Sequence, residues 1–147
     1  MTAMDKVEVA IAIIHQNGKF LMQLRDDLPT IIFPGHWGFF GGHIEPGEDA
    51  DTGVRRELYE EIGYVPNTIT LFESTEDERV IRHFYQAELT VPVEDLELNE
   101  GQDIGLCTVA DIQRGYKYSL KLREDRPLGH PHQRALLSFI AQHGELI

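Results

Sequence analysis

The chain has 147 residues, of which 41% are hydrophobic, and this length and composition fit one globular domain with its own core. Its formal net charge of −12 disfavours sequence-independent binding to DNA or RNA, because an acidic surface repels phosphate backbones. The single cysteine, Cys107, excludes an intramolecular disulfide and argues against a cysteine-based metal site.

The sequence shows no sign of membrane insertion or secretion. It contains no run of about 18 apolar residues that could span a membrane. The segment from Met1 to Lys6 lacks the basic and then apolar pattern of a signal peptide. We therefore expect a cytoplasmic protein without a membrane partner, and one domain over residues 1–147.

The first third of the chain predicts a β-hairpin, a loop and a short strand. The apolar, β-branched segment 7–14 is followed by Asn17-Gly18, a strong hairpin signal, and by a returning strand over 19–25. The first strand is almost continuously apolar, which predicts cover on both of its faces. Prolines predict a loop over 26–36, and Trp37 to Gly42 reads as one short strand that ends in a glycine turn.

The rest of the chain alternates helical and extended patterns. Residues 49–62 predict a helix that Gly63 ends, with Pro66 beyond it. The order of elements predicts an α/β (α+β) fold in which a mixed sheet lies between helices. The remaining predicted elements are strands over 68–74, 80–89 and, more weakly, 103–109, a loop over 92–101, and helices over 110–113 and 131–143.

The helix over 49–62 carries three glutamates on one side. Glu57, Glu60 and Glu61 fall within an arc of about 100°, because each residue advances a helix by about 100°. Like charges this close are unfavourable, and Mg²⁺ or Mn²⁺ bound by carboxylate oxygens would offset the repulsion. A solvated acidic face is the alternative, and the three glutamates taken alone favour it.

Glycines around this helix favour the metal site. Gly41 and Gly42 leave bare backbone where side chains would obstruct an approaching phosphate. Gly53 lies between Glu57 and Glu60 in helical angle, although a glycine inside a helix costs about 1 kcal/mol relative to alanine. Gly53 is either simply tolerated or allows another backbone to approach closely.

The segment 42–64 has a characteristic spacing: Gly42 is followed after five residues by Glu48, and after seven more by Arg56-Glu57-Leu58-x-Glu60-Glu61-x-Gly63. This pattern resembles the signature box of the Nudix hydrolases, the MutT-like family. Tyr64 stands where the family usually has an aliphatic residue, a departure that affects packing more than chemistry. The preceding hairpin and following strands also match the family's order, which implies an α/β/α sandwich.

The resemblance implies a role for each box residue. Glu57 and Glu61 would bind the metal, with Glu60 a ligand or close neighbour, and the backbone carbonyl near Gly42 would be a further ligand. Arg56 would orient the glutamates through a salt bridge, and Glu48 would support Arg56. Family members often use another acidic residue from the second half; here Glu100 is the candidate, with Glu97 and Glu94 as rivals.

The implied reaction is Mg²⁺-dependent hydrolysis of the diphosphate linkage in a nucleoside diphosphate-X substrate, by attack of water at phosphorus. The alternative is a module of the same type that senses a nucleotide without cutting it, but that alternative predicts damaged box glutamates. An isoprenoid diphosphate isomerase would need an earlier cysteine than Cys107, and RNA decapping fits poorly with the negative charge.

Candidate substrate contacts lie outside the glutamates. Trp37 and His36 are the first candidates for contact with a nucleobase, and Gly41 and Gly42 for contact with phosphate. Phe39 and Phe40 are expected in the core instead. Arg79, Arg82 and His83 are candidates to face an anion, while His130 and His132 either reach a phosphate or metal or are ordinary loop residues. The sequence leaves open which nucleotide-like diphosphate is the substrate, and whether the protein is a homodimer.

Overall fold

A computed structural model of the protein describes residues 6–147. Most of the segment in which we find no signal-peptide pattern, Met1 to Asp5, lies outside these residues. Within them, no helix is both long and apolar enough to cross a membrane.

The predicted hairpin forms the centre of the sheet. Strand β1 (Val7–Gln16) pairs antiparallel with β2 (Lys19–Leu24). Asn17 and Gly18 both have positive φ, 53° and 77°, as a tight two-residue hairpin turn requires. Both faces of β1 carry buried residues from Ala12 onward, in agreement with its apolar run.

The segment after the loop forms two strands, which corrects the prediction of one. Strand β3 (Trp37–Gly38) pairs with β2, whereas β4 (Phe40–His43) pairs with the first half of β1. The break falls at Phe39 because the chain changes its pairing partner there. Gly41, with φ of 136°, faces Ala10 so closely that a Cβ atom would collide with the Ala10 carbonyl oxygen.

The sheet is mixed. Strand β6 (Val80–Glu88) runs parallel to β1, and β5 (Thr70–Glu76) pairs antiparallel with β6 at the edge. Strand β7 (Asp103–Cys107) adds to β2, which completes a seven-stranded sheet.

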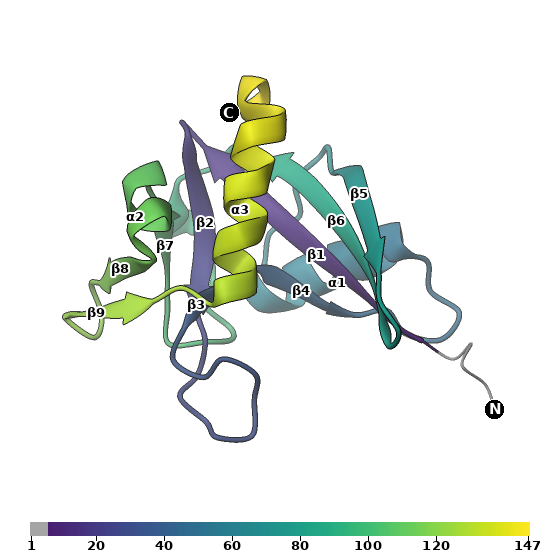
Figure 1. Cartoon of the computed structure of the whole chain (residues 1–147), viewed down its shortest axis with the longest axis horizontal. Helices are drawn as coiled ribbons and strands as arrows, with labels where there is room; N and C mark the ends of the chain where they lie inside the picture. Colours follow the sequence, from purple (N-terminus) through teal and green to yellow (C-terminus); the bar gives the residue numbers. More distant parts are fainter. Residues whose placement is uncertain (1–5) are drawn as a thin grey trace.

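Helices cover both faces of this sheet, as Figure 1 shows. Helix α1 (Ala50–Ile62) packs against β4 and β1, where Leu58 and Ile62 join one buried cluster. Helix α3 (His130–His143) crosses the opposite face, where Phe139 joins the other cluster. The expected α/β/α layering is confirmed.

The region between β7 and α3 contains a hairpin that the sequence did not predict. Within residues 6–147, strands β8 (Tyr116–Ser119) and β9 (Glu124–Pro127) pair only with each other and carry many exposed side chains, so their apolar pattern is weak. Three further short helices connect the strands or end the chain: η1 (Val93–Asp95), α2 (Val109–Arg114) and η2 (Gly144–Leu146).

Candidate active site

Helix α1 is held at both ends, and this fixes the direction of its glutamates. The Asp49 carboxylate caps the first turn by accepting a hydrogen bond from the Thr52 amide at 2.8 Å. Gly63 ends the helix in the left-handed region, with φ of 66°. Val54, Leu58 and Ile62 are buried against the sheet, so the opposite flank carries the charged residues.

Glu61 is buried against the sheet, and only 3% of the residue is exposed. One carboxylate oxygen accepts a hydrogen bond from the Gly41 amide at 3.0 Å, and the other accepts one from the Gln23 side-chain amide at 2.8 Å. Burial raises the pKa of Glu61 to about 8, although both hydrogen bonds favour the charged form. No Lys or Arg within residues 6–147 forms an ion pair with this carboxylate.

Glu57 lies over the bare backbone of Gly42. A Cβ atom at Gly42 would lie 2.7 Å from the Glu57 carboxyl carbon, so only glycine leaves room for this side chain. Burial raises the pKa of Glu57, while a hydrogen bond from Arg56 at 3.0 Å opposes the rise. The two glycines therefore give Glu57 and Glu61 their places against β4.

Arg56 links the acidic residues around it. Its guanidinium donates to both oxygens of Glu48, at 2.7 and 2.9 Å, to Glu57 at 3.0 Å and to Glu60 at 3.4 Å. The Arg56 bond is the largest of the effects that lower the pKa of Glu48 to about 2. Gly53 serves this pair, since a Cβ there would lie 3.1 Å from the Glu48 carboxylate. The group that approaches Gly53 is a side chain, and not the backbone of the second alternative.

The three glutamates of the predicted metal site differ in their surroundings. The Glu60 side chain is 57% exposed and turns toward Arg56, the Glu57 side chain is 17% exposed, and Glu61 is buried. Within residues 6–147, no three acidic, histidine or cysteine side chains are gathered closely enough to hold a metal ion as they stand.

The loop before β7 brings a further acid toward this pair. The negative charge of Glu100 adds to the effects, led by burial, that raise the pKa of both Glu57 and Glu61. Its rival Glu97 lies instead at the end of α1, where its backbone amide donates to the Ile62 carbonyl. Glu94 lies in η1 and is exposed.

A cleft of about 330 Å³ adjoins the glutamates, between the sheet and the first half of α3. Its volume falls within the range of small-molecule sites. Gly41 and Gly42 line this cleft and also contact Glu61 and Glu57, so they join the acidic cluster to the cleft. The remaining walls include Phe39, Phe40 and side chains from β6 and α3.

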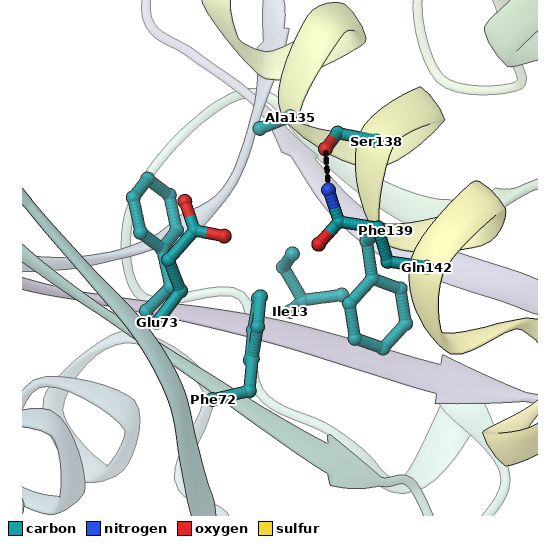
Figure 2. Close-up of a pocket in the computed structure, with 8 residues that line it drawn as sticks. Ile13, Phe72, Glu73, Ala135, Ser138, Phe139 and Gln142 are labelled. Atoms are coloured by element: carbon teal, nitrogen blue, oxygen red, sulfur yellow. Dashed lines mark hydrogen bonds between the residues drawn. The ribbon is translucent and has the colours of Figure 1, made fainter.

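The second hollow under α3 is far smaller. Figure 2 shows Glu73 of β5 across from Ser138 and Gln142 of α3, with Phe72 and Phe139 below them. The volume is about 40 Å³, enough for little more than a water molecule and too small for a nucleotide.

The structure corrects the expectation for Trp37. Its side chain is fully buried in the core, and its ring nitrogen donates to the Lys117 carbonyl at 3.1 Å, so neither ring face is free for a base. His36 is only partly buried but does not line the cleft; its Nδ1 lies 2.9 Å from the Pro34 carbonyl. Phe39 and Phe40 are buried, as predicted.

Of the two candidate arginines, one lines the cleft and the other does not. Arg82 lines the cleft and pairs with Asp77 at 2.9 Å, whereas Arg79 is exposed in the turn before β6 and does not line it. His83 contacts Glu8 at 2.9 Å. His132 lines the cleft, but His130 does not.

Sequence reasoning missed Gln23 and Arg25. Gln23 is buried in β2 and holds Glu61, and Arg25 lies at the end of that strand in the cleft wall. A polar residue inside the apolar run Phe20-Leu21-Met22-Gln23-Leu24 is a signal that could have identified Gln23, because a buried amide needs a partner.

Comparison with known proteins decides the family. The model of the NUDIX domain matches residues 4–126. The chain belongs to the Nudix family. Nucleoside triphosphatase NudI of Escherichia coli O1:K1 / APEC is 38% identical over 56 residues, which are 37% of this chain and 38% of that protein. The corresponding protein of Enterobacter sp. (strain 638) is 39% identical over the same length. The chain thus matches little more than a third of the length of these curated relatives.

Solved Nudix structures share the fold. A structure from a study of MutT from Aliivibrio salmonicida and Vibrio cholerae has a TM-score of 0.71 and 22% identity, and the match covers 94% of this chain and 99% of that one. The NUDIX domain of Shewanella oneidensis NrtR, complexed with ADP ribose, has a TM-score of 0.69 and 18% identity, covering 93% and 88%. The predicted resemblance to MutT-like Nudix hydrolases is confirmed.

The thiol expected of the isomerase alternative is absent from the site. Cys107 is fully buried in β7 with its sulfur 3.3 Å from that of Met22, and burial raises its pKa to about 12. A thiol with this pKa is a poor nucleophile at neutral pH.

Proposed function

We propose that this Nudix protein hydrolyses the diphosphate linkage of a nucleoside diphosphate-X substrate in the presence of Mg²⁺. The observation that carries the proposal is the position of Gly41 and Gly42, which contact Glu61 and Glu57 and also line the 330 Å³ cleft. A phosphate chain running from the cleft along these glycines would reach the glutamates.

The acidic cluster suits a hard divalent cation. Glu57 and Glu61 are both withdrawn from water, Glu100 adds a third negative charge nearby, and Glu61 has no cationic partner within residues 6–147. We assign the ion to Glu57, Glu61 and the Gly42 carbonyl, with the exposed Glu60 as a further ligand. When bound, Mg²⁺ would neutralise diphosphate oxygens and lower the pKa of the attacking water; Mn²⁺ is expected to substitute.

The protein's own residues then have separate tasks. Arg56 and Glu48 hold Glu57 in its orientation, and Gln23 with the Gly41 amide holds Glu61. One glutamate of the cluster, with Glu100 as the candidate outside the box, accepts the proton of the attacking water. The aromatic and basic walls of the cleft bind the nucleoside. The NudI relatives are nucleoside triphosphatases, so we propose triphosphates as the first substrates to test.

The decisive experiment is a Mg²⁺-dependent hydrolysis screen with products identified by chromatography. It would include nucleoside triphosphates, nucleoside diphosphate sugars, ADP-ribose and dinucleoside polyphosphates. We expect wild type to release a nucleoside monophosphate, and Glu57→Gln and Glu61→Gln to lose activity by about 10²-fold or more while remaining folded. Glu78→Gln, in the exposed β5–β6 turn, is the matched control and should retain full activity.

Two outcomes would overturn the proposal. Near-normal turnover by both glutamine variants would remove the glutamates from the chemistry. Thermal stabilisation by one nucleotide, without hydrolysis of any compound, would favour the sensing module in its place.

A further inference from the structure

The polar side chains in the wall of the cleft all carry N–H donors, and none carries an oxygen acceptor. They are Arg25, Arg82 and His132; the other lining residues are aliphatic, aromatic, proline or glycine. No carboxylate, amide or hydroxyl side chain lines the cleft within the described chain. This composition is unusual in a protein with 25 acidic and 13 basic residues, and it calls for a ligand that supplies acceptors.

The protonation state and tautomer of His132 follow from its surroundings. The Phe39 amide donates a hydrogen bond to His132 Nδ1 at 3.2 Å, so this nitrogen carries no proton. Burial, helped by the nearby charge of Arg25, lowers the pKa of His132 to about 4, and the ring is therefore neutral at pH 7. A neutral ring that accepts at Nδ1 carries its proton on Nε2. Within residues 6–147 this Nε2–H group has no acceptor.

Arg25 lies beside His132. A Cβ atom built on Gly38 would lie 3.3 Å from His132 Nε2 and 3.6 Å from Arg25 Cδ, so both side chains share the bare face of that glycine. The Arg25 Nε donates to the Ile32 carbonyl at 2.7 Å, but the guanidinium forms no ion pair with a carboxylate of residues 6–147. By contrast, the guanidinium of Arg82 is paired with Asp77.

Aromatic rings flank these donors. The rings of Phe39 and Phe33 lie 4.8 and 6.1 Å from that of His132, measured between centroids. Phe33 has φ of 52°, a left-handed conformation that is strained for a bulky residue and persists only where surrounding contacts hold it. The wall thus combines apolar ring surface with the side chains of His132 and Arg25.

We propose that this cleft binds the base of the nucleotide by its carbonyl edge, with His132 Nε2–H and the Arg25 guanidinium as donors. The proposal rests on the function proposed above and adds the class of base. Hypoxanthine, uracil, thymine and the O6/N7 edge of guanine present acceptors to such a pair. Adenine and cytosine place an amino group where these bases have a carbonyl, so a donor would face a donor and lose its partner.

The test compares substrates that differ only in this exchange: ITP with ATP, and UTP with CTP. We expect wild type to favour the carbonyl member of each pair by about 10-fold or more in kcat/KM, since sites built for a hydrogen bond reject partners that cannot make it. His132→Asn keeps an acceptor for the Phe39 amide but is too short to replace Nε2, and the preference should fall toward one. His132→Gln, whose amide N–H reaches further, should restore part of it.

Arg25→Met is an independent variant should His132→Asn fail to fold, and it should also reduce the preference. Its matched control is Arg134→Met, the same change at an exposed position of α3 that does not line the cleft. A general loss of activity with an unchanged ratio in both His132→Asn and Arg25→Met would contradict the proposal.

Binding of the monophosphates IMP and AMP, measured by calorimetry, separates this proposal from that of hydrolysis. Equal kcat/KM for ITP and ATP would overturn the carbonyl readout and leave the hydrolase standing. Should no triphosphate be hydrolysed, the monophosphates decide alone: tighter binding of IMP by about 10-fold supports the readout, and equal affinity overturns it.

Discussion

At the scale of single residues, the site depends on two glycines whose lack of a Cβ atom leaves room for other groups. Gly42 lets the Glu57 carboxylate lie on the backbone of β4, and Gly41 offers its amide to Glu61. Both glutamates are thereby held where water is scarce and their pKa values rise. Neither glycine is needed for flexibility of the whole strand. Each is needed because another group occupies the space that a Cβ atom would fill.

Gly42→Ala is expected to reduce kcat/KM by about 10- to 100-fold, the usual effect of disturbing groups that orient metal ligands. The new Cβ would lie 2.7 Å from the Glu57 carboxyl, which is the end of a flexible side chain and would move aside without unfolding the protein. Steady-state kinetics and thermal melting measure the two effects. Gly144→Ala is the control, because a Cβ there meets no atom of residues 6–147 within 4 Å. Wild-type kinetics for Gly42→Ala would refute the argument.

At the scale of elements, α1 combines strong local signals with one local conflict. Asp49 and Gly63 cap it, and Leu58 and Ile62 bury its inner face. Gly53 contradicts helix propensity, and the Glu48–Arg56 pair explains why: the Glu48 carboxylate fills the space beside Gly53 and is fixed by Arg56 and by the Glu45 amide at 2.9 Å. Gly53 thus lowers the helix propensity of α1 but leaves space for the Glu48 carboxylate.

Gly53→Ala is therefore expected to give none of the gain of about 1 kcal/mol in the free energy of unfolding that alanine normally brings inside a helix. Its Cβ would lie 3.1 Å from a Glu48 oxygen that cannot withdraw without breaking its bonds. In a Glu48→Ala background the gain should appear, so the two substitutions should be coupled. Urea denaturation of the four proteins measures this. A gain in stability of about 1 kcal/mol from Gly53→Ala in the presence of Glu48 would contradict this coupling, because Glu48 and Arg56 would then have moved without cost.

At the scale of the whole molecule, the sheet separates two cores. One contains α1, and the other contains α3 and the β8–β9 side of the protein. The cleft lies between the sheet and α3, whereas the glutamates lie on α1 and adjoin the cleft through Gly41 and Gly42. His132 lies in the wall of this cleft, where its imidazole is largely withdrawn from water and neutral. Unfolding would return the imidazole to water.

This burial makes stability depend on pH. The pKa of His132 is about 4 in the folded protein against 6.5 as its ordinary value, so between these pH values the unfolded chain binds a proton that the folded one does not. Stability should fall as the pH drops from about 6.5 to 4, by up to about 3 kcal/mol from this group. The loss of stability should be smaller in His132→Asn than in wild type. Titration of the carboxylates contributes equally in both proteins, so it cancels in the comparison. Urea denaturation between pH 7 and 4 tests this, and parallel curves would contradict it.

The sequence by itself determined the elements whose signals are local. Asn17-Gly18 set the first hairpin, and the caps and spacing of 49–63 set α1 and its row of glutamates, because turns, caps and helical faces depend on residues a few positions apart. The family and its layered fold followed from that spacing.

Only the tertiary structure decided how these residues are surrounded. Glu60 and Glu61 are neighbours in the chain, yet one is exposed and the other buried, because β2 and β4 cover only Glu61. Trp37 was expected at a base and lies in the core, while His132 and Arg25, more than 100 residues apart, meet over Gly38. Such meetings depend on how separate elements pack, and spacing along a single sequence carries no record of them.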